Sequence, residues 1–151
     1  MSTIRTLVGR VFVVQWRRRD VEDVKRVWSE VDAAFRRLGE PIVYVSFIGE
    51  GTPAESKGFD ATLLHFYGAC AMLCDSVYLV VEGSTPERAE ERARIATALR
   101  SKNLRPIVAK TTAELQRLAP RNLREELKLA MDVAVNGAMP ASAHFRTSRL
   151  Q

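Results

Sequence analysis

The sequence contains few of the residues that disulfides and metal sites require. Of its 151 residues, two are cysteine and two are histidine. Cys70 and Cys74 are four residues apart on one predicted helix, a placement that rarely has disulfide geometry, so we expect free thiols and a reducing compartment. His65 precedes Cys70 by five residues, which turns the two side chains about 140° apart around that helix. We therefore expect neither a bound metal nor a cofactor.

Long apolar segments and nucleotide-binding motifs are also absent. No run of roughly eighteen apolar residues occurs, so membrane insertion is not expected. The first residues lead into a strand-like segment rather than the apolar core of a signal peptide, which predicts a cytoplasmic protein. The chain has neither the Walker A spacing nor a GxGxxG motif, so a nucleotide site has no sequence signature.

The charge of the chain is modestly positive, with 23 lysines and arginines against 18 aspartates and glutamates, a net +5. The arginines at 17–19 and 36–37 stand at opposite ends of one predicted helix and do not form a stripe with exposed aromatic side chains. Such a distribution favours solubility and the steering of a partner. Nucleic acid is therefore not an expected partner.

What the sequence does have is enough apolar material for one core, 46% of its residues, in alternating strand and helix patterns. Strands are predicted on both sides of a turn at Gly9-Arg10, within 4–16, and at 42–48, 76–81 and 106–109. Helices are predicted at 21–38, from 56 to about 74, from 86 to about 102, from 112 onward, and between Pro120 and Gly137.

Strands separated by helices require parallel crossovers, so the expected fold class is α/β. We expect a sandwich whose mostly parallel central sheet consists of the N-terminal hairpin and three further strands, flanked by helices, with an extra C-terminal helix. Residues 1–137 are expected to form one domain, and residues 138–151 a mobile tail.

Two predicted helices carry unusual apolar surface. The segment 56–74 is apolar all round, more than one buried face needs, so Phe66 and Tyr67 are expected to form an interface with a partner or a second copy. A charged residue at either position is then expected to abolish association without unfolding the protein. The helix from residue 86 is expected to approach the sheet through a stripe of small and apolar residues: Ala89, Ala93, Ala96 and Leu99. The rest of this Glu- and Arg-rich helix, with Glu90 and Arg94 on its outer face, is expected to be solvated surface.

The element order resembles that of STAS domains, the anti-sigma-factor-antagonist family, over roughly residues 5–118. The segments that suggest it are GRVFVV (9–14), PIVYV (41–45) and CDSVYLVVEG (74–83). The resemblance implies a protein-interaction fold in which a kinase partner phosphorylates a Ser or Thr at the start of the second helix and so controls binding. Ser56, followed by Lys57-Gly58, is the nearest equivalent; the family's Asp-Ser-Ser-Gly turn is absent and the loop is longer.

Candidate site residues lie in the loops after the predicted strands, because ligands of open α/β sheets bind beyond the carboxyl ends of the strands. After the strand 42–48, the candidate partner-contact or switch loop contains Glu50, Thr52, Glu55, Ser56 and Lys57. After the next two strands, the candidate anion-binding residues at helix starts are Ser84, Thr85, Lys110 and Thr111. Ordinary helix capping by itself also accounts for this last group.

No nucleophile–base pair or metal cluster emerges from these residues. Glu50, Glu55 and Glu82 lack a histidine nearby in the sequence, so solvated loop carboxylates fit them better than acid–base catalysis. The sequence therefore predicts a non-catalytic regulatory or scaffolding module that binds a protein and forms a homodimer, with the Thr52–Ser56 loop as contact and switch. The alternative is a binder of a small anion, such as a nucleotide or phosphorylated metabolite, or an enzyme, that uses the same sheet edge.

Overall fold

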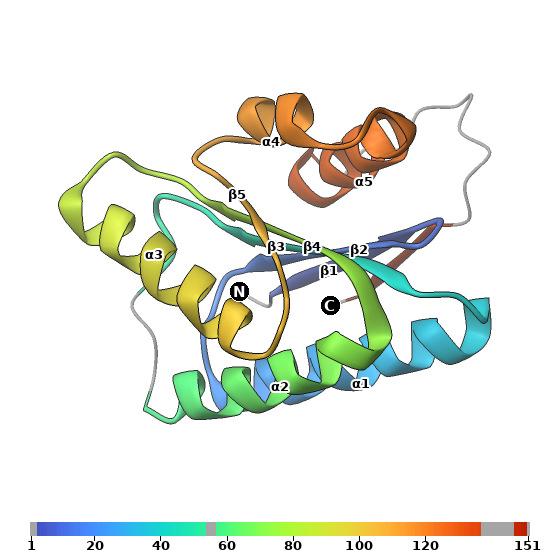
Figure 1. Cartoon of the computed structure of the whole chain (residues 1–151), viewed down its shortest axis with the longest axis horizontal. Helices are drawn as coiled ribbons and strands as arrows, with labels where there is room; N and C mark the ends of the chain where they lie inside the picture. The colour runs from blue at the N-terminus through green and yellow to red at the C-terminus, as the bar shows by residue number, and fades with distance from the viewer. Residues whose placement is uncertain (1–2, 54–56, 137–146, 151) are drawn as a thin grey trace.

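The computed structural model describes residues 3–53, 57–136 and 147–150, which form a six-stranded sheet between two layers of helices (Figure 1). In chain order the elements are β1 (Ile4–Val8), β2 (Val11–Trp16), α1 (Val21–Leu38), β3 (Ile42–Ile48), α2 (Phe59–Leu73), β4 (Cys74–Val81), α3 (Pro86–Ser101), β5 (Ile107–Ala109), α4 (Thr112–Leu118), a 3₁₀ turn at Arg121–Leu123, α5 (Arg124–Asn136) and β6 (Thr147–Leu150). Up to residue 136, the type and order of the strands and α-helices match the sequence prediction.

The strand order in the sheet is β5-β4-β3-β2-β1-β6. Strands β2 to β5 are parallel neighbours, whereas β1 pairs antiparallel with β2, and β6 pairs antiparallel with β1. Each crossover moves the chain one strand further in the same direction, and α1, α2 and α3 cover one face while α4 and α5 cover the other (Figure 1). The mostly parallel α/β fold expected from the sequence is confirmed.

The central strands are apolar without alternation because the sheet is buried on both faces. Along β2, Phe12 and Val14 belong to the core under α1 to α3, and Val11 and Val13 to the core under α5. Trp16 ends this strand with its ring packed edge-on against Phe59, at 5.5 Å between centroids, and its ring nitrogen donates to Ser46 Oγ at 2.9 Å. These contacts hold the carboxyl ends of β2 and β3 next to the first turn of α2.

Three helices begin at side chains that accept a hydrogen bond from a backbone N–H in the first turn. Asp20 caps α1 by accepting from Asp23, Thr85 caps α3 by accepting from Arg88, and Thr111 caps α4 by accepting from Glu114. Short polar side chains at these positions are typical helix N-caps. None of the helices in the described part of the chain has the length and apolar character needed to cross a membrane.

The C-terminal end differs from the expected mobile tail. Residues 147–150 form β6, whose partners on β1 run from Arg5 to Val8. The segment Thr-Ser-Arg-Leu has no strand periodicity of its own, so its strand conformation comes from the unpaired edge of β1, which offers a row of backbone donors and acceptors. The rest of the predicted tail, 138–146 and 151, lies outside the described residues.

The interface prediction for Phe66 and Tyr67 is corrected by their burial: the side chains are 0% and 2% exposed. Both face the core between α2, α1 and the sheet, because α2 packs against α1, α3 and β4 and so needs apolar residues on more than one side. The large apolar side chains of this helix that are exposed are Leu64 and Met72. A charged residue at position 66 or 67 therefore perturbs the core rather than a free surface.

The predicted inner stripe of α3 is also corrected in part. Ala96 and Leu99 are buried, but Ala89 and Ala93 are exposed. The buried face of α3 consists of Arg92, Ile95, Ala96 and Leu99. The helix is therefore rotated from the expected orientation, because Arg92 occupies a buried position that the sequence pattern assigned to the surface.

The turn between β1 and β2 is closed by a carboxylate from α5. Gly9 has φ +60°, and Glu126 Oε1 accepts from the backbone N–H of Arg10 at 3.0 Å. A Cβ at Gly9 would lie 2.9 Å from the Glu126 Cδ. We expect Gly9→Ala to lower the free energy of unfolding by about 2 kcal/mol, because it combines left-handed backbone strain with loss of a charged hydrogen bond.

Chemical denaturation measures this effect, with Gly51→Ala as the matched control. An added Cβ at Gly51 meets no atom within 4 Å. The control is expected to change stability by less than about 0.5 kcal/mol. Equal effects of the two substitutions would contradict the assigned role of Glu126.

A partly buried ion pair couples the stability of the fold to pH. Glu30 on α1 pairs with Arg5 on β1, with 2.7 Å between Oε2 and Nε. Burial raises the pKa of Glu30, and the charges of Arg5 and Arg26 offset this only in part. A carboxyl whose pKa is higher in the folded state stabilises the fold most below its unfolded pKa, and this contribution is lost as pH rises through the folded pKa.

We expect the stability of the wild type relative to Glu30→Gln to fall as pH is raised from about 4 to about 7. Urea denaturation at each pH measures the difference between the two proteins. Glu22→Gln, an exposed position on the same helix, serves as the control. If the stability of the wild type relative to Glu30→Gln instead rises with pH, the ion pair with Arg5, and not burial, determines the direction of the pKa shift of Glu30.

Candidate functional site

The carboxyl ends of β2, β3 and β4 lie at one edge of the sheet, and the loops that follow them contact one another. The hydroxyl of Thr52 donates to the carbonyl oxygen of Trp16 at 3.3 Å, which links the loop after β3 to the end of β2. The backbone N–H of Glu82 donates to the carbonyl of Ile48 at 2.9 Å, which extends the β3–β4 ladder into the next loop. The loops after neighbouring strands therefore form one continuous surface.

Arg88, in the first turn of α3, holds the loop after β3 by its backbone. One guanidinium nitrogen donates to the carbonyl oxygens of Gly49, Glu50 and Thr52, at 3.1, 2.7 and 3.2 Å. The Arg88 side chain is 12% exposed. A single buried guanidinium thus satisfies three carbonyl groups that no helix or strand pairs.

Arg19 holds the end of the same loop from the other side. Its Nε and Nη2 donate to the carbonyl of Pro53, at 3.0 and 2.7 Å. Glu91 lies between the two arginines: one of its oxygens pairs with Arg19, and the other accepts from Arg88 Nη1 at 3.0 Å. We call Arg19, Arg88 and Glu91 the arginine clamp and residues 49–53 the clamped loop.

A third charged residue of α3, Arg92, holds the loop after β4. Arg92, one turn after Arg88, donates to the carbonyl oxygens of Val81 and Gly83 at 2.7 and 2.8 Å. Gly83 has φ +115°, and a Cβ there would lie 2.8 Å from the Cγ of Arg88. Glycine at this position therefore allows Arg88 to pass over the turn and reach the clamped loop.

The predicted contact-loop residues are only partly presented to solvent. Glu50 and Lys57 are exposed, whereas Thr52 is half-buried and its hydroxyl points back to Trp16. Glu55 and Ser56 lie outside the described residues. The exposed part of the clamped loop consists of Glu50, Gly51 and Pro53.

Two of the four predicted anion-binding residues are helix caps. Thr85 and Thr111 cap α3 and α4 with their side chains, and Ser84 and Lys110 are exposed. Phe66 and Tyr67 lie in the core on α2, so they do not contribute to this surface.

The clamp, which decides the geometry of the site, was not predicted from the sequence. The Glu- and Arg-rich part of α3 was expected to face solvent, because charged residues in a helix usually form its outer face. A local signal was present at Arg92, which occupies the helical position three residues before the apolar Ile95. The pairing of Arg19 with Glu91 joins residues 72 positions apart and has no local signal.

The clamped loop borders a cavity whose lining offers charged and hydrogen-bonding groups. An open cavity of about 560 Å³ is lined by Gln15, Trp16, Arg17 and Arg18 and by four residues of the clamped loop: Gly49, Gly51, Thr52 and Pro53. Residues 3–53 and 57–136 contain no group of three metal-ligating side chains. A hydrogen bond with Cys74 and burial raise the pKa of the Cys70 thiol well above its ordinary value, so this thiol does not supply a nucleophilic thiolate.

No family model, curated protein or solved structure matches this chain.

Proposed function

We propose that the chain is a STAS-like, non-catalytic module that binds a protein partner in a regulatory or scaffolding role, with the clamped loop at the centre of the contact surface. The observation that carries the proposal is the contrast between the buried arginine clamp and the exposed loop that it holds. The clamp side chains of Arg19, Glu91 and Arg88 are 3%, 13% and 12% exposed. The loop side chain of Glu50 faces solvent.

Stability alone is a poor explanation for this arrangement. Burying charges costs free energy, and well-packed apolar residues often replace a buried ion pair without loss of stability. The clamp instead fixes the backbone of an exposed loop at four carbonyl groups. A loop that is already fixed loses less conformational entropy when a partner binds, so the clamp favours recognition.

Thr52 is the described residue at which modification would act on this loop. Its hydroxyl donates to the Trp16 carbonyl, and Arg17 and Arg18 line the same cavity. A phosphoryl group on Thr52 would break that hydrogen bond and place negative charge beside the arginines. We propose that this change alters the loop and so switches partner binding.

Affinity capture from native lysate tests the contact surface with two matched charge reversals. Glu50→Lys changes the clamped loop, while Glu40→Lys changes an exposed residue just before β3, at the opposite end of that strand. We expect the wild type and Glu40→Lys to retain the same partner and Glu50→Lys to retain at least tenfold less. Equal retention by all three proteins, or no specific partner for the wild type, would refute the proposal.

A small anion is a second candidate ligand for the cavity of about 560 Å³, because the described residues that line it include two arginines and no carboxylate. Ligand at a hundredfold its Kd would raise the free energy of unfolding by about 2.7 kcal/mol. A thermal-shift panel of nucleotides and phosphorylated metabolites tests this candidate. A stabilising ligand whose effect disappears in Arg17→Ala would favour it over the protein-interaction role.

A further inference from the structure

The sheet has a second, independent surface at its β5 edge. β5 (Ile107–Ala109) pairs with β4 on one side and is the terminal strand of the sheet, so no other described strand pairs with its outer side. Ile107 and Val108 are half-buried although they lie in a strand. At the opposite edge, β6 pairs with β1 and is itself the terminal strand.

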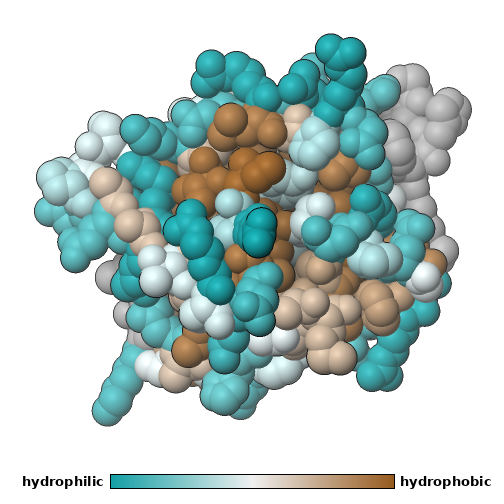
Figure 2. Space-filling view, viewed as in Figure 1, coloured by the Kyte–Doolittle hydropathy of each residue, from teal (hydrophilic) through white to brown (hydrophobic). Residues whose placement is uncertain are grey.

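The space beside β5 is bounded by two helices. On the α3 side an open groove of about 370 Å³ is lined by small and apolar residues of the helix and strand and by a few charged ones: Ala89, Arg92, Ala93, Ala96, Arg100, Val108, Ala109, Lys110 and Glu114. On the other side α4 packs on β5 and leaves Leu118 50% exposed. Figure 2 shows apolar residues gathered over β5 and α4, with hydrophilic residues around them.

The groove is open because the α3 side chains that line it are small. Ala89 and Ala93 are exposed, and they stand one turn apart on the side of α3 that faces β5. Larger side chains there would close the approach to the outer side of the strand. Ala89 and Ala93, which the sequence pattern assigned to the core, are therefore exposed, and their small size leaves the β5 edge accessible to an added chain.

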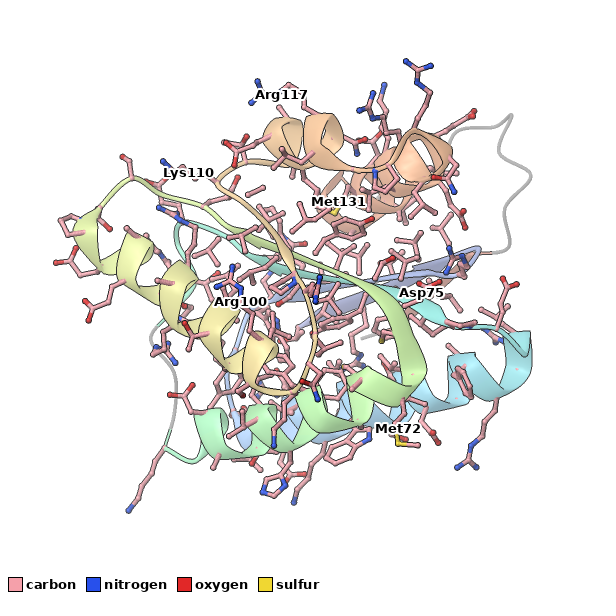
Figure 3. All side chains as sticks on the ribbon, viewed as in Figure 1. Met72, Asp75, Arg100, Lys110, Arg117 and Met131 are labelled. Atoms are coloured by element: carbon pink, nitrogen blue, oxygen red, sulfur yellow. The ribbon has the colours of Figure 1, made fainter. Side chains whose placement is uncertain are left out.

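The rim of this surface is basic. Arg100 lines the groove and also a neighbouring cavity of about 520 Å³ that contains Arg105. Figure 3 shows Arg100 on α3, Lys110 at the end of β5 and Arg117 on α4 around this face, and all three side chains are exposed. Glu114 is the one carboxylate among the groove residues, and it accepts from the Lys110 backbone N–H at 3.2 Å.

We propose that an extended, acidic segment of a protein partner adds to the sheet as a strand beside β5. The unpaired strand edge supplies main-chain hydrogen bonds, the alanine groove takes the apolar side chains of the added strand, and the basic rim attracts its carboxylates. A second copy of this chain fits less well, because two β5 edges would bring Arg100, Arg105 and Lys110 of both copies together.

This surface is separate from the clamped loop, so the inference goes beyond the proposed function. The clamp residues Arg88 and Glu91 belong to the same helix as Ala89 and Ala93 but hold the loop after β3 rather than the β5 edge. A scaffold needs two surfaces that bind different partners. The chain carries both on a single small sheet.

Binding of a synthetic peptide tests the proposal, using a short segment in which glutamate alternates with valine and a counterpart with lysine in place of glutamate. Fluorescence anisotropy measures the affinity, and hydrogen exchange followed by NMR reports on the β5 amides. We expect the glutamate peptide to bind at least tenfold more tightly than the lysine peptide and to slow exchange within residues 107–109. Failure of the glutamate peptide to bind would overturn the proposal.

Two pairs of variants locate the binding. Arg100→Glu and Ala93→Trp change the rim and fill the groove, and each is expected to weaken peptide binding at least tenfold. Arg37→Glu on α1 and Ala71→Trp on α2 are exposed controls that are expected to bind as the wild type does. Unchanged affinity in both groove variants would overturn the proposal.

Other occupants of the edge give different results. If inorganic phosphate displaces the peptide and β5 exchange is not slowed, the rim is a simple anion site and the proposal is wrong. If light scattering finds a dimer that Ala93→Trp dissociates and Ala71→Trp does not, the occupant is a second copy and the proposal is wrong.

Discussion

Phe66→Ala is expected to lower the free energy of unfolding by about 3–5 kcal/mol, the usual range for truncating a fully buried phenylalanine. The Phe66 ring meets Tyr44 edge-on at 5.4 Å between centroids and contacts Trp28 at 6.1 Å and Tyr67 at 6.2 Å. Truncation leaves a cavity among three aromatic rings that belong to α1, α2 and β3. Urea denaturation followed by circular dichroism measures the loss.

Phe66→Asp is expected to prevent folding, because it places an unpaired carboxylate at a position with no exposed surface. Leu64→Asp, two residues earlier on α2, is the matched control, since Leu64 is exposed and its replacement is expected to leave the fold intact. A Phe66→Asp protein that stays folded but no longer associates would contradict the structure and restore the original interface prediction.

Glu91→Ala is expected to lower the free energy of unfolding by about 3 kcal/mol, because it leaves Arg19 and Arg88 buried close to each other without their shared carboxylate. Glu90→Ala removes the same side chain from the neighbouring exposed position and is expected to cost less than about 0.5 kcal/mol. Chemical denaturation of the two variants isolates the contribution of the clamp.

The same pair of variants also tests whether the clamp holds the loop. Amide exchange in residues 49–53 is expected to speed up in Glu91→Ala and to stay unchanged in Glu90→Ala. In the partner-capture assay, Glu91→Ala is expected to lose affinity even at temperatures where it remains folded. If Glu91→Ala is destabilised but amide exchange in residues 49–53 is unchanged, the clamp stabilises the fold and does not hold the loop.

Local patterns predicted most of the fold because the elements of this chain agree with their own sequence. The run from Ile42 to Ile48 reads as a buried strand because both faces of β3 are covered. The caps at Asp20, Thr85 and Thr111 mark helix starts correctly, since a cap needs only neighbouring residues. The short strand β6 was missed because its pairing depends entirely on the distant β1.

The candidate site was predicted less well, because a periodic pattern places charged residues on the outer face of a helix and the local signal at Arg92 was overridden by it. Sequence reasoning placed the contact loop after β3 and identified Thr52 within it, but it assigned the Glu- and Arg-rich surface of α3 to solvent. Arg88, Glu91 and Arg92 are instead buried or half-buried against the loops. It also placed Phe66 and Tyr67 at an interface, because an all-round apolar helix does not reveal how many neighbours cover it.

Some features of this protein are therefore determined by its local sequence, and others only by its tertiary packing. Strand and helix positions, helix caps, the turn at Gly9 and the α/β class follow from the sequence, because propensity, capping and periodicity act between residues close along the chain. The arginine clamp, the orientation of α3, the burial of Phe66 and the open β5 edge follow only from the packed structure. Each depends on how residues far apart along the chain are packed together, and such long-range contacts leave no local pattern in the sequence.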